Sequence, residues 1–291
     1  MLAQLIANGI VAGAEIAIVA MSFAFIYSAT RFFNFAHASS YLAGAYVAYF
    51  LVVVARCSLA IGVGGAVVGS ILVGLTMEAL VFRRLRRRGA SSLILLLTSF
   101  GLLVAFQSVI SVVFGDGTLV LSRAKVSEVL TIGGARITAV QAVIVVACVS
   151  IGGCSSVLFR FAHQGRVFRA IASDPELAAM RGVRVDRAIL TIFAIGSGVA
   201  GLAGVLVGLD TDLYPLMGLH ALLLAMVAAI VGGIDTPAAA GLGGLLIGFA
   251  QQFGVWKLPS AWQDAIAFFI LIIFLLFRPQ GFFGETFKRA S

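Results

Sequence analysis

Long apolar stretches recur along all 291 residues of this chain, and they restrict its fold more than any other feature. Runs of 18 or more residues are each long enough to cross about 30 Å of hydrocarbon as a helix. Charged residues make up only 11% of the chain, whereas soluble domains carry about 25%, so there are too few charges to cover a soluble globule. A transmembrane barrel would need alternating polar residues, which these runs lack. We therefore expect an all-α integral membrane protein, a polytopic bundle of about eight to ten transmembrane helices.

The apolar runs predict nine spans. They cover residues 4–28, 39–55, 59–82, 91–114, 139–159, 188–209, 220–234, 238–255 and 261–277. The run 220–234 is short for a span, and residues 34–55 fit a broken helix as well, so eight or ten spans stay open. No linker divides the chain, and we expect one membrane domain over residues 1–291. The first run lacks a basic flank and a small-residue cleavage site, which predicts a retained span and not a signal peptide.

The basic residues predict the orientation of the spans. The net charge is +8, and cytoplasmic loops of membrane proteins collect Lys and Arg, so the charge needs no nucleic-acid partner. If the arginine-rich segment 83–88 is cytoplasmic, alternating spans place 15 of the 20 basic residues inside. This arrangement has the N-terminus outside and the C-terminus in the cytoplasm.

The longest polar loop, residues 160–187, has the pattern of a short helix. Ser173, Asp174, Pro175 and Glu176 are typical of a helix start, and Gly182 of a helix end. The prediction is a helix over about residues 175–181. Two interpretations stay open. In the first, the helix with its small Ala178 and Ala179 fits a groove on a soluble partner that drives this subunit. In the second, its flanking arginines, among them Arg166 and Arg169, hold it on anionic lipid headgroups.

Polar residues within the apolar runs are candidates for a translocation route or gate. Glu15 lies midway along the first run, where a carboxylate is costly and by default functional. An interhelical hydrogen bond is the structural alternative for Glu15, and packing is the expected role of Gln107. Glu78 is close enough in sequence to Arg83 to pair with it.

A second polar group begins the second run. It consists of Asn34, His37, Ser39 and Ser40. His37 fits a proton relay or a pH-sensitive gate, although a hydrogen-bonded turn is the favoured interpretation. Elsewhere, Ala240, Gly244 and Gly248 recur at four-residue spacing, which predicts a flat strip for close helix packing.

Four ordered blocks resemble one family, the permease subunits of bacterial ABC importers of the branched-chain amino acid type, also called the hydrophobic amino acid and urea-amide family. Glu176, Ala178 and Gly182 fit its E-x-A-x-x-x-G coupling segment, and the other blocks resemble its N-F-A-H-G, G-G-x-G-S-x-P-G-A and R-P-x-G-L-F-G patterns. These blocks are FFNFAHASSYLAGAYVAY at 32–49, VAAIVGGIDTPAAAGLGGLLIGFAQ at 227–251 and FRPQGFFG at 277–284. The chain departs from the patterns at Ala38 and at Asp235, each replacing a usual glycine near a polar turn. Asp235 is for this reason a further candidate for the route.

The resemblance implies the rest of a transport machine in a bacterial plasma (inner) membrane. It implies a second related permease subunit, two cytoplasmic ATPase subunits that bind ATP and Mg²⁺, and an extracytoplasmic substrate-binding protein. Its implied substrate is a small amino acid such as Leu, Ile or Val, with urea, short amides and small carboxylates as alternatives. The residues implied to couple the permease to the ATPases are Arg166, Arg169, Asp174, Pro175, Glu176, Ala178, Ala179 and Gly182. The chain itself has no G-x-x-x-x-G-K-[ST] motif, so we expect no cofactor in it.

Other classes remain as alternatives or are disfavoured. An ATP-independent secondary transporter or channel would use Glu15 and His37 as proton carriers, and a structural scaffold would transport nothing. No nucleophile elbow or H-E-x-x-H pattern suggests an enzyme. The three His and three Cys are too scattered to predict a metal site.

Overall fold

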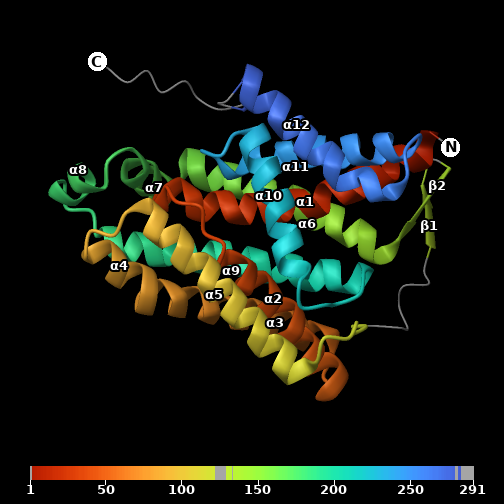
Figure 1. Ribbon diagram of the computed structural model, residues 1–291, viewed down its shortest axis with the longest axis horizontal. Coiled ribbons are helices and arrows are strands. Elements are labelled where there is room, and N and C mark those ends of the chain that lie inside the picture. The colour runs from red at the N-terminus through yellow and green to blue at the C-terminus, as the bar shows by residue number, and fades with distance from the viewer. Residues whose placement is uncertain (1, 122–128, 133, 279–280, 283–291) are drawn as a thin grey trace.

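The computed structural model describes residues 2–121, 129–132, 134–278 and 281–282. Long helices dominate it (Figure 1), and the expected polytopic helical fold is confirmed. They are α1 (Leu2–Thr30), α2 (His37–Tyr49), α3 (Leu59–Met77), α5 (Ser92–Phe114), α6 (Ala139–Phe161), α9 (Val185–Asp210), α10 (Met217–Gly232), α11 (Pro237–Val255) and α12 (Gln263–Phe277). Within the described ranges, eight helical segments are long and apolar enough to cross a membrane, and α10 is a shorter apolar helix of 16 residues.

Two of the spans contain π-helical segments. The segment η1 (Phe50–Val54) continues α2, so residues His37–Val54 form one continuous span and not a broken helix. The segments η2 (Glu78–Phe82) and α4 (Arg83–Arg87) continue α3 in the same way. A π turn changes which helix face the following side chains occupy, and π turns are frequent at functional sites.

The bundle has two distinct ends (Figure 1). The arginine end carries Arg31, α4, and the helices α7 (His163–Ser173) and α8 (Pro175–Met180); the hairpin end carries the start of α1 and the antiparallel strands β1 (Val129–Ile132) and β2 (Ala135–Thr138). Among the residues that the structure describes, each polar contact between loops joins loops of the same end, as the alternating spans predict. These contacts are Arg31–Asp235 and Arg83–Asp186 at one end, and Gln4–Arg136, Gln141–Asp210 and His220–Asp264 at the other.

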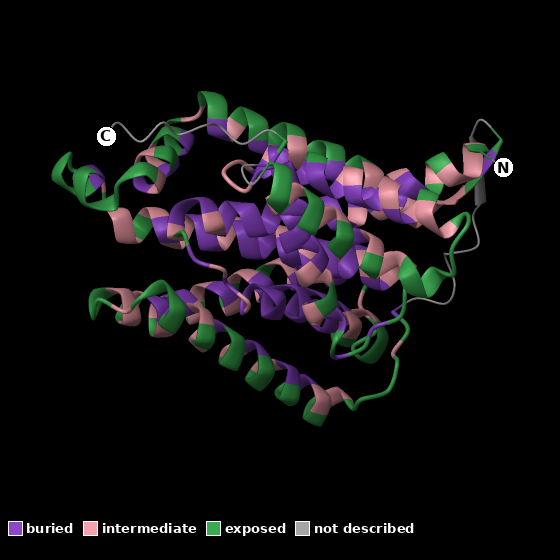
Figure 2. Cartoon of the chain, turned by 45° about the horizontal axis from the view of Figure 1, so that its top comes forward, coloured by how far each residue is buried: buried purple, intermediate pink, exposed green. Residues whose placement is uncertain are grey.

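Helix α1 is the centre of the bundle. In its most apolar stretch 83% of residues are buried, against 6% for the last span, which therefore lies at the periphery. Figure 2 shows the buried residues concentrated along the middle of the bundle. Small residues of α11 lie directly against α1, since a Cβ on Gly244 would meet Ala17 and one on Gly248 would meet the backbone of Gly13. Such close approach supplies the van der Waals contact that holds membrane helices together.

Peripheral helices expose apolar side chains outward. Val112 of α5 is 86% exposed, Val149 of α6 is 70% exposed and Leu276 of α12 is 75% exposed. Such surfaces are stable only against lipid or another apolar surface. The outer faces of α5, α6 and α12 are therefore surfaces for the membrane or for a partner subunit.

Candidate functional site

The predicted short helix of the long loop is present as α8, and its ends are set by local chemistry. The Asp174 carboxylate accepts hydrogen bonds from the backbone N–H groups of Glu176 and Leu177, each at 2.9 Å, and Pro175 occupies the first turn. Gly182 ends the helix at a φ of +85°, a backbone conformation that favours glycine. These residues fix a helix of six residues that protrudes at the arginine end (Figure 1).

The exposed face of α8 is more apolar than a water-facing helix needs. Met180 is 85% exposed and Leu177 is 49% exposed, and Glu176 and Ala179 are also exposed. Ala178 is instead buried against the chain itself, so only one of the two small alanines lies on the outer surface. Leu177 and Met180 were not among the predicted residues, although two large apolar residues three apart on a short helix of a polar loop are a signal that points to them.

A second helix in the loop, α7, was not predicted. Its buried Phe168 packs on Phe159 of α6 at 6.1 Å between ring centroids, and Ile171 is also buried. Arg169 donates a hydrogen bond to the carbonyl oxygen of Phe159, so this arginine holds α7 against α6. Arg166 remains exposed. The pair Phe168 and Ile171 forms an apolar stripe that distinguishes α7 from an irregular loop.

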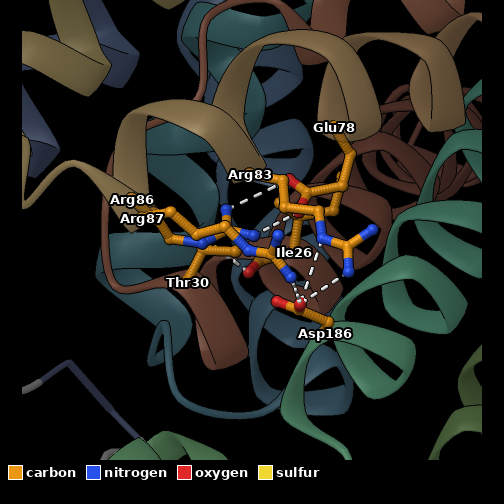
Figure 3. Close-up of polar contacts among 7 residues, drawn as sticks. All are labelled: Ile26, Thr30, Glu78, Arg83, Arg86, Arg87 and Asp186. Atoms are coloured by element: carbon orange, nitrogen blue, oxygen red, sulfur yellow. Dashed lines mark hydrogen bonds and ion pairs between the residues drawn. The ribbon is translucent and has the colours of Figure 1, made fainter.

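An ion-pair network joins the segment after α8 to the end of the third span (Figure 3). Asp186, at the start of α9, accepts hydrogen bonds from Arg83 at 2.7 and 3.0 Å and from Arg87 at 2.6 Å. The buried Glu78 pairs with Arg86. The expected pair of Glu78 with Arg83 is therefore wrong, because Arg83 turns toward the carboxylate that α9 brings beside it.

The candidate Asp235 lies in the turn before α11 and lines a cavity that we call the inner cavity. This cavity of about 360 Å³ at the arginine end is also lined by Arg31, Arg160 and Arg169. The Asp235 carboxylate is 2.6 Å from an Arg31 guanidinium nitrogen. The inner cavity is thus mainly basic, and its acidic group is paired with one of its arginines.

The polar group at the start of α2 is brought together, but it is packed closed. His37 is 2% exposed and its Nε2 lies 2.9 Å from Ser22 Oγ, while Ser40 Oγ lies 3.2 Å from Ser197 Oγ. Ser22 and Ser197 were not among the predicted residues, since they lie on other helices. The small space beside these groups has no room for a water molecule. The buried atoms that lack a partner within the described part of the chain include Asn34 Oδ1, His37 Nδ1 and Ser39 Oγ.

Glu15 and Gln107 face two different spaces toward the hairpin end. Glu15 lines an outer cavity of about 550 Å³ between α1, α2, α9, α10 and α12, together with Tyr41, Asp212 and His220. Gln107 lines a separate cavity of about 590 Å³ beside α5. Among the described residues, no group of three or more His, Cys, Asp or Glu is placed to hold a metal ion.

Comparison with known proteins gives consistent similarity over nearly the whole chain. Residues 5–275 match the family described as branched-chain amino acid transport system / permease component. The high-affinity branched-chain amino acid transport system permease protein LivH of Escherichia coli K12 is 30% identical, covering 96% of this chain and 94% of LivH. The corresponding permease BraD of Pseudomonas aeruginosa is 30% identical over 97% of this chain and 95% of BraD. The probable branched-chain amino acid transport permease protein LivH of Methanocaldococcus jannaschii is 26% identical, covering 94% of this chain and 89% of that protein.

Proposed function

Because this chain belongs to the family of branched-chain amino acid transport permease components, we propose that it carries Leu, Ile or Val across a bacterial plasma (inner) membrane under the power of separate ATPase subunits. The names of its relatives support that substrate class. Urea, short amides and small carboxylates are the alternatives that the same machinery admits. ATP and Mg²⁺ bind in the partner subunits, and this chain supplies the membrane route.

The observation that carries the proposal is the exposed face of α8. A helix of six residues is far too short to span the bilayer, and it presents Leu177 and Met180 beside Glu176. Exposed apolar side chains gathered on a surface helix suit a protein or a membrane interaction site. We favour a protein partner, namely an ATPase subunit with a matching groove, because the resemblance to ABC importer permeases implies such a subunit.

The contacts around α8 give a path for the movement. Arg169, Phe168 and Phe159 hold α7 on α6, and Asp186 holds the start of α9 on the third span through Arg83 and Arg87. A displacement of α8 by the ATPase therefore acts on several spans at once. ATP biases the two packings of the bundle because the partner subunits bind it unequally in the two states.

The orientation follows from the same assignment. We place the arginine end, the C-terminus and α8 in the cytoplasm, in agreement with the Lys and Arg bias. The hairpin end then faces the extracytoplasmic binding protein. The apolar outer faces of α5, α6 and α12 are available to lipid and to a second, related permease subunit.

The proposal is tested by reconstitution of the complete complex in proteoliposomes. We expect uptake of labelled leucine that depends on ATP and persists after a protonophore collapses the proton gradient. Uptake by this chain alone, driven by a pH gradient, would instead identify a secondary transporter with Glu15 and His37 as proton carriers. No transport under any condition would identify a scaffold.

The position of the ATPase is tested by cross-linking in native membranes. A cysteine introduced by Met180→Cys should cross-link to the ATPase subunit. The matched control Val149→Cys, exposed on the apolar surface of α6, should not. Cross-linking from position 149 with none from position 180 would exclude α8 as the docking site.

A further inference from the structure

Glu15 is an acidic group in the membrane-spanning part of the chain that faces the outer cavity. It lies near the middle of α1, is half-buried and accepts no hydrogen bond from the described residues. An ionisable side chain at such a depth is costly, and in membrane proteins it almost always faces a partner or a water-filled cavity. Since the described residues supply no hydrogen-bond donor to Glu15, the outer cavity is where a partner would reach it.

The charges around the outer cavity favour a cation. Glu15 and Asp212 line it, whereas no Lys or Arg does so among the residues that the structure describes. His220 lines it as well, but its imidazole lies 3.1 Å from the Asp264 carboxylate, so any positive charge there is matched by a negative one. The inner cavity has the opposite character, with Arg31, Arg160 and Arg169 in its lining.

The rest of the lining suits a small aliphatic molecule. Ile16, Val19 and Leu224 form an apolar wall, and Tyr41 and Tyr214 add aromatic faces that attract cations. The volume of about 550 Å³ lies within the roughly 300–1,000 Å³ of small-molecule sites. A molecule with one cationic group and an aliphatic body therefore matches both the charge and the shape.

We infer that the outer cavity is a substrate site in which the Glu15 carboxylate binds the ammonium group of an aliphatic amine. The inference rests on the proposed function, and it narrows the substrate class. Amino acids and their amides carry the required ammonium group. Oxo acids and other small carboxylates lack the ammonium group, so Glu15 and Asp212 repel their net negative charge. Urea carries no charge and gains nothing from Glu15 as an ion-pair partner.

The test uses ligand binding to the assembled complex in nanodiscs, without binding protein or nucleotide, measured by saturation-transfer NMR. The probes are leucine and two relatives of it. Leucinamide keeps the ammonium group and lacks the carboxylate. The oxo acid of leucine keeps the carboxylate and lacks the ammonium group. We expect signals from leucine and leucinamide and none from the oxo acid. A signal from the oxo acid as strong as that of leucinamide, or no signal from leucinamide, would overturn the inference.

Variants assign the binding to Glu15 itself. Glu15→Gln keeps the shape and removes the charge, and it should weaken leucinamide binding about tenfold to a hundredfold, the usual effect of losing a hydrogen bond to a charged group. Glu15→Asp should retain part of the affinity. The matched control is Asp116→Asn, at an exposed position of the same end that lines the cavity beside α5 and not the outer cavity. This variant should bind as the unchanged protein does. Unchanged binding of leucinamide by Glu15→Gln would refute the assignment. If that variant does not fold, the comparison of the three probes on the unchanged protein still tests the inference.

ATP-driven uptake is a separate readout. A complex that takes up leucine with ATP but binds no leucinamide refutes this site and leaves the proposed function intact. A complex that binds leucinamide but shows no ATP-driven uptake refutes the proposed function and leaves the site intact.

Discussion

The guanidinium group of Arg31 lies 2.6 Å from the Asp235 carboxylate and joins the end of α1 to the turn before α11, 204 residues later in the chain. Arg31 also donates a hydrogen bond of 3.3 Å to the carbonyl oxygen of Ala172 in α7. One arginine thus connects two spans and the loop that carries α8. This pair gives a structural reason for Asp235, one of the positions at which the chain departs from the family pattern.

Arg31 and Asp235 should contribute unequally to the free energy of unfolding. Both side chains are partly exposed, so Asp235→Ala should lower the free energy of unfolding by less than about 1 kcal/mol. Arg31→Ala also loses the bond to α7 and should cost more. Thermal unfolding of the purified protein in detergent measures both. Equal losses in the two variants would show that the bond to Ala172 contributes nothing.

Close packing of α11 on α1 should be intolerant of larger residues. In Gly248→Leu the new side chain meets the Gly13 backbone, and overpacking of this kind costs about 1–3 kcal/mol or more. Gly153→Leu is the matched control, because a Cβ at Gly153 of α6 meets nothing within 4 Å. We expect a lower unfolding temperature and a smaller monodisperse fraction on size-exclusion chromatography for Gly248→Leu alone. Equal behaviour of the two variants would contradict the packing geometry.

Removing the cap of α8 should loosen this helix without unfolding the bundle. Asp174→Ala loses the hydrogen bonds to Glu176 and Leu177, and the loss of such a cap costs about 0.5–2 kcal/mol locally. Hydrogen exchange at these two amides should accelerate, and ATP-driven uptake should fall. Asp174→Asn keeps a capping oxygen and serves as the control. Unchanged exchange in Asp174→Ala would show that the cap does not maintain α8.

The Asp186 network should matter more for coupling than for folding. Asp186→Asn replaces a carboxylate shared by Arg83 and Arg87 with a neutral group, so the start of α9 is held less firmly on the third span. We expect fewer leucine molecules transported per ATP hydrolysed, with ATPase activity retained. Asp116→Asn makes the same charge change at the opposite end and should leave the ratio unchanged. An unaltered ratio in Asp186→Asn would exclude this network from the transmission of movement.

The sequence by itself located the eight long spans and α8, because the causes act within a segment, although it left open whether residues 34–55 form a broken helix. Each span closes its own backbone hydrogen bonds in hydrocarbon, so length and apolar content determine where it begins and ends. Asp174, Pro175 and Gly182 likewise define the short helix from within ten residues. Helix α7 was not predicted, although its buried Phe168 and Ile171 carry a local signal.

Only the tertiary structure decided which of these residues meet. The partners of Asp186, which are Arg83 and Arg87, lie about a hundred residues earlier in the chain. Whether Arg83 pairs with Asp186 or with Glu78 depends on how the helices are rotated against one another. The same packing buries Ala178, exposes Met180, encloses His37 beside Ser22 and leaves Glu15 facing the outer cavity. Composition and spacing place a polar residue within a span, but the shapes of neighbouring helices determine whether it faces a partner, a closed interior or an open cavity.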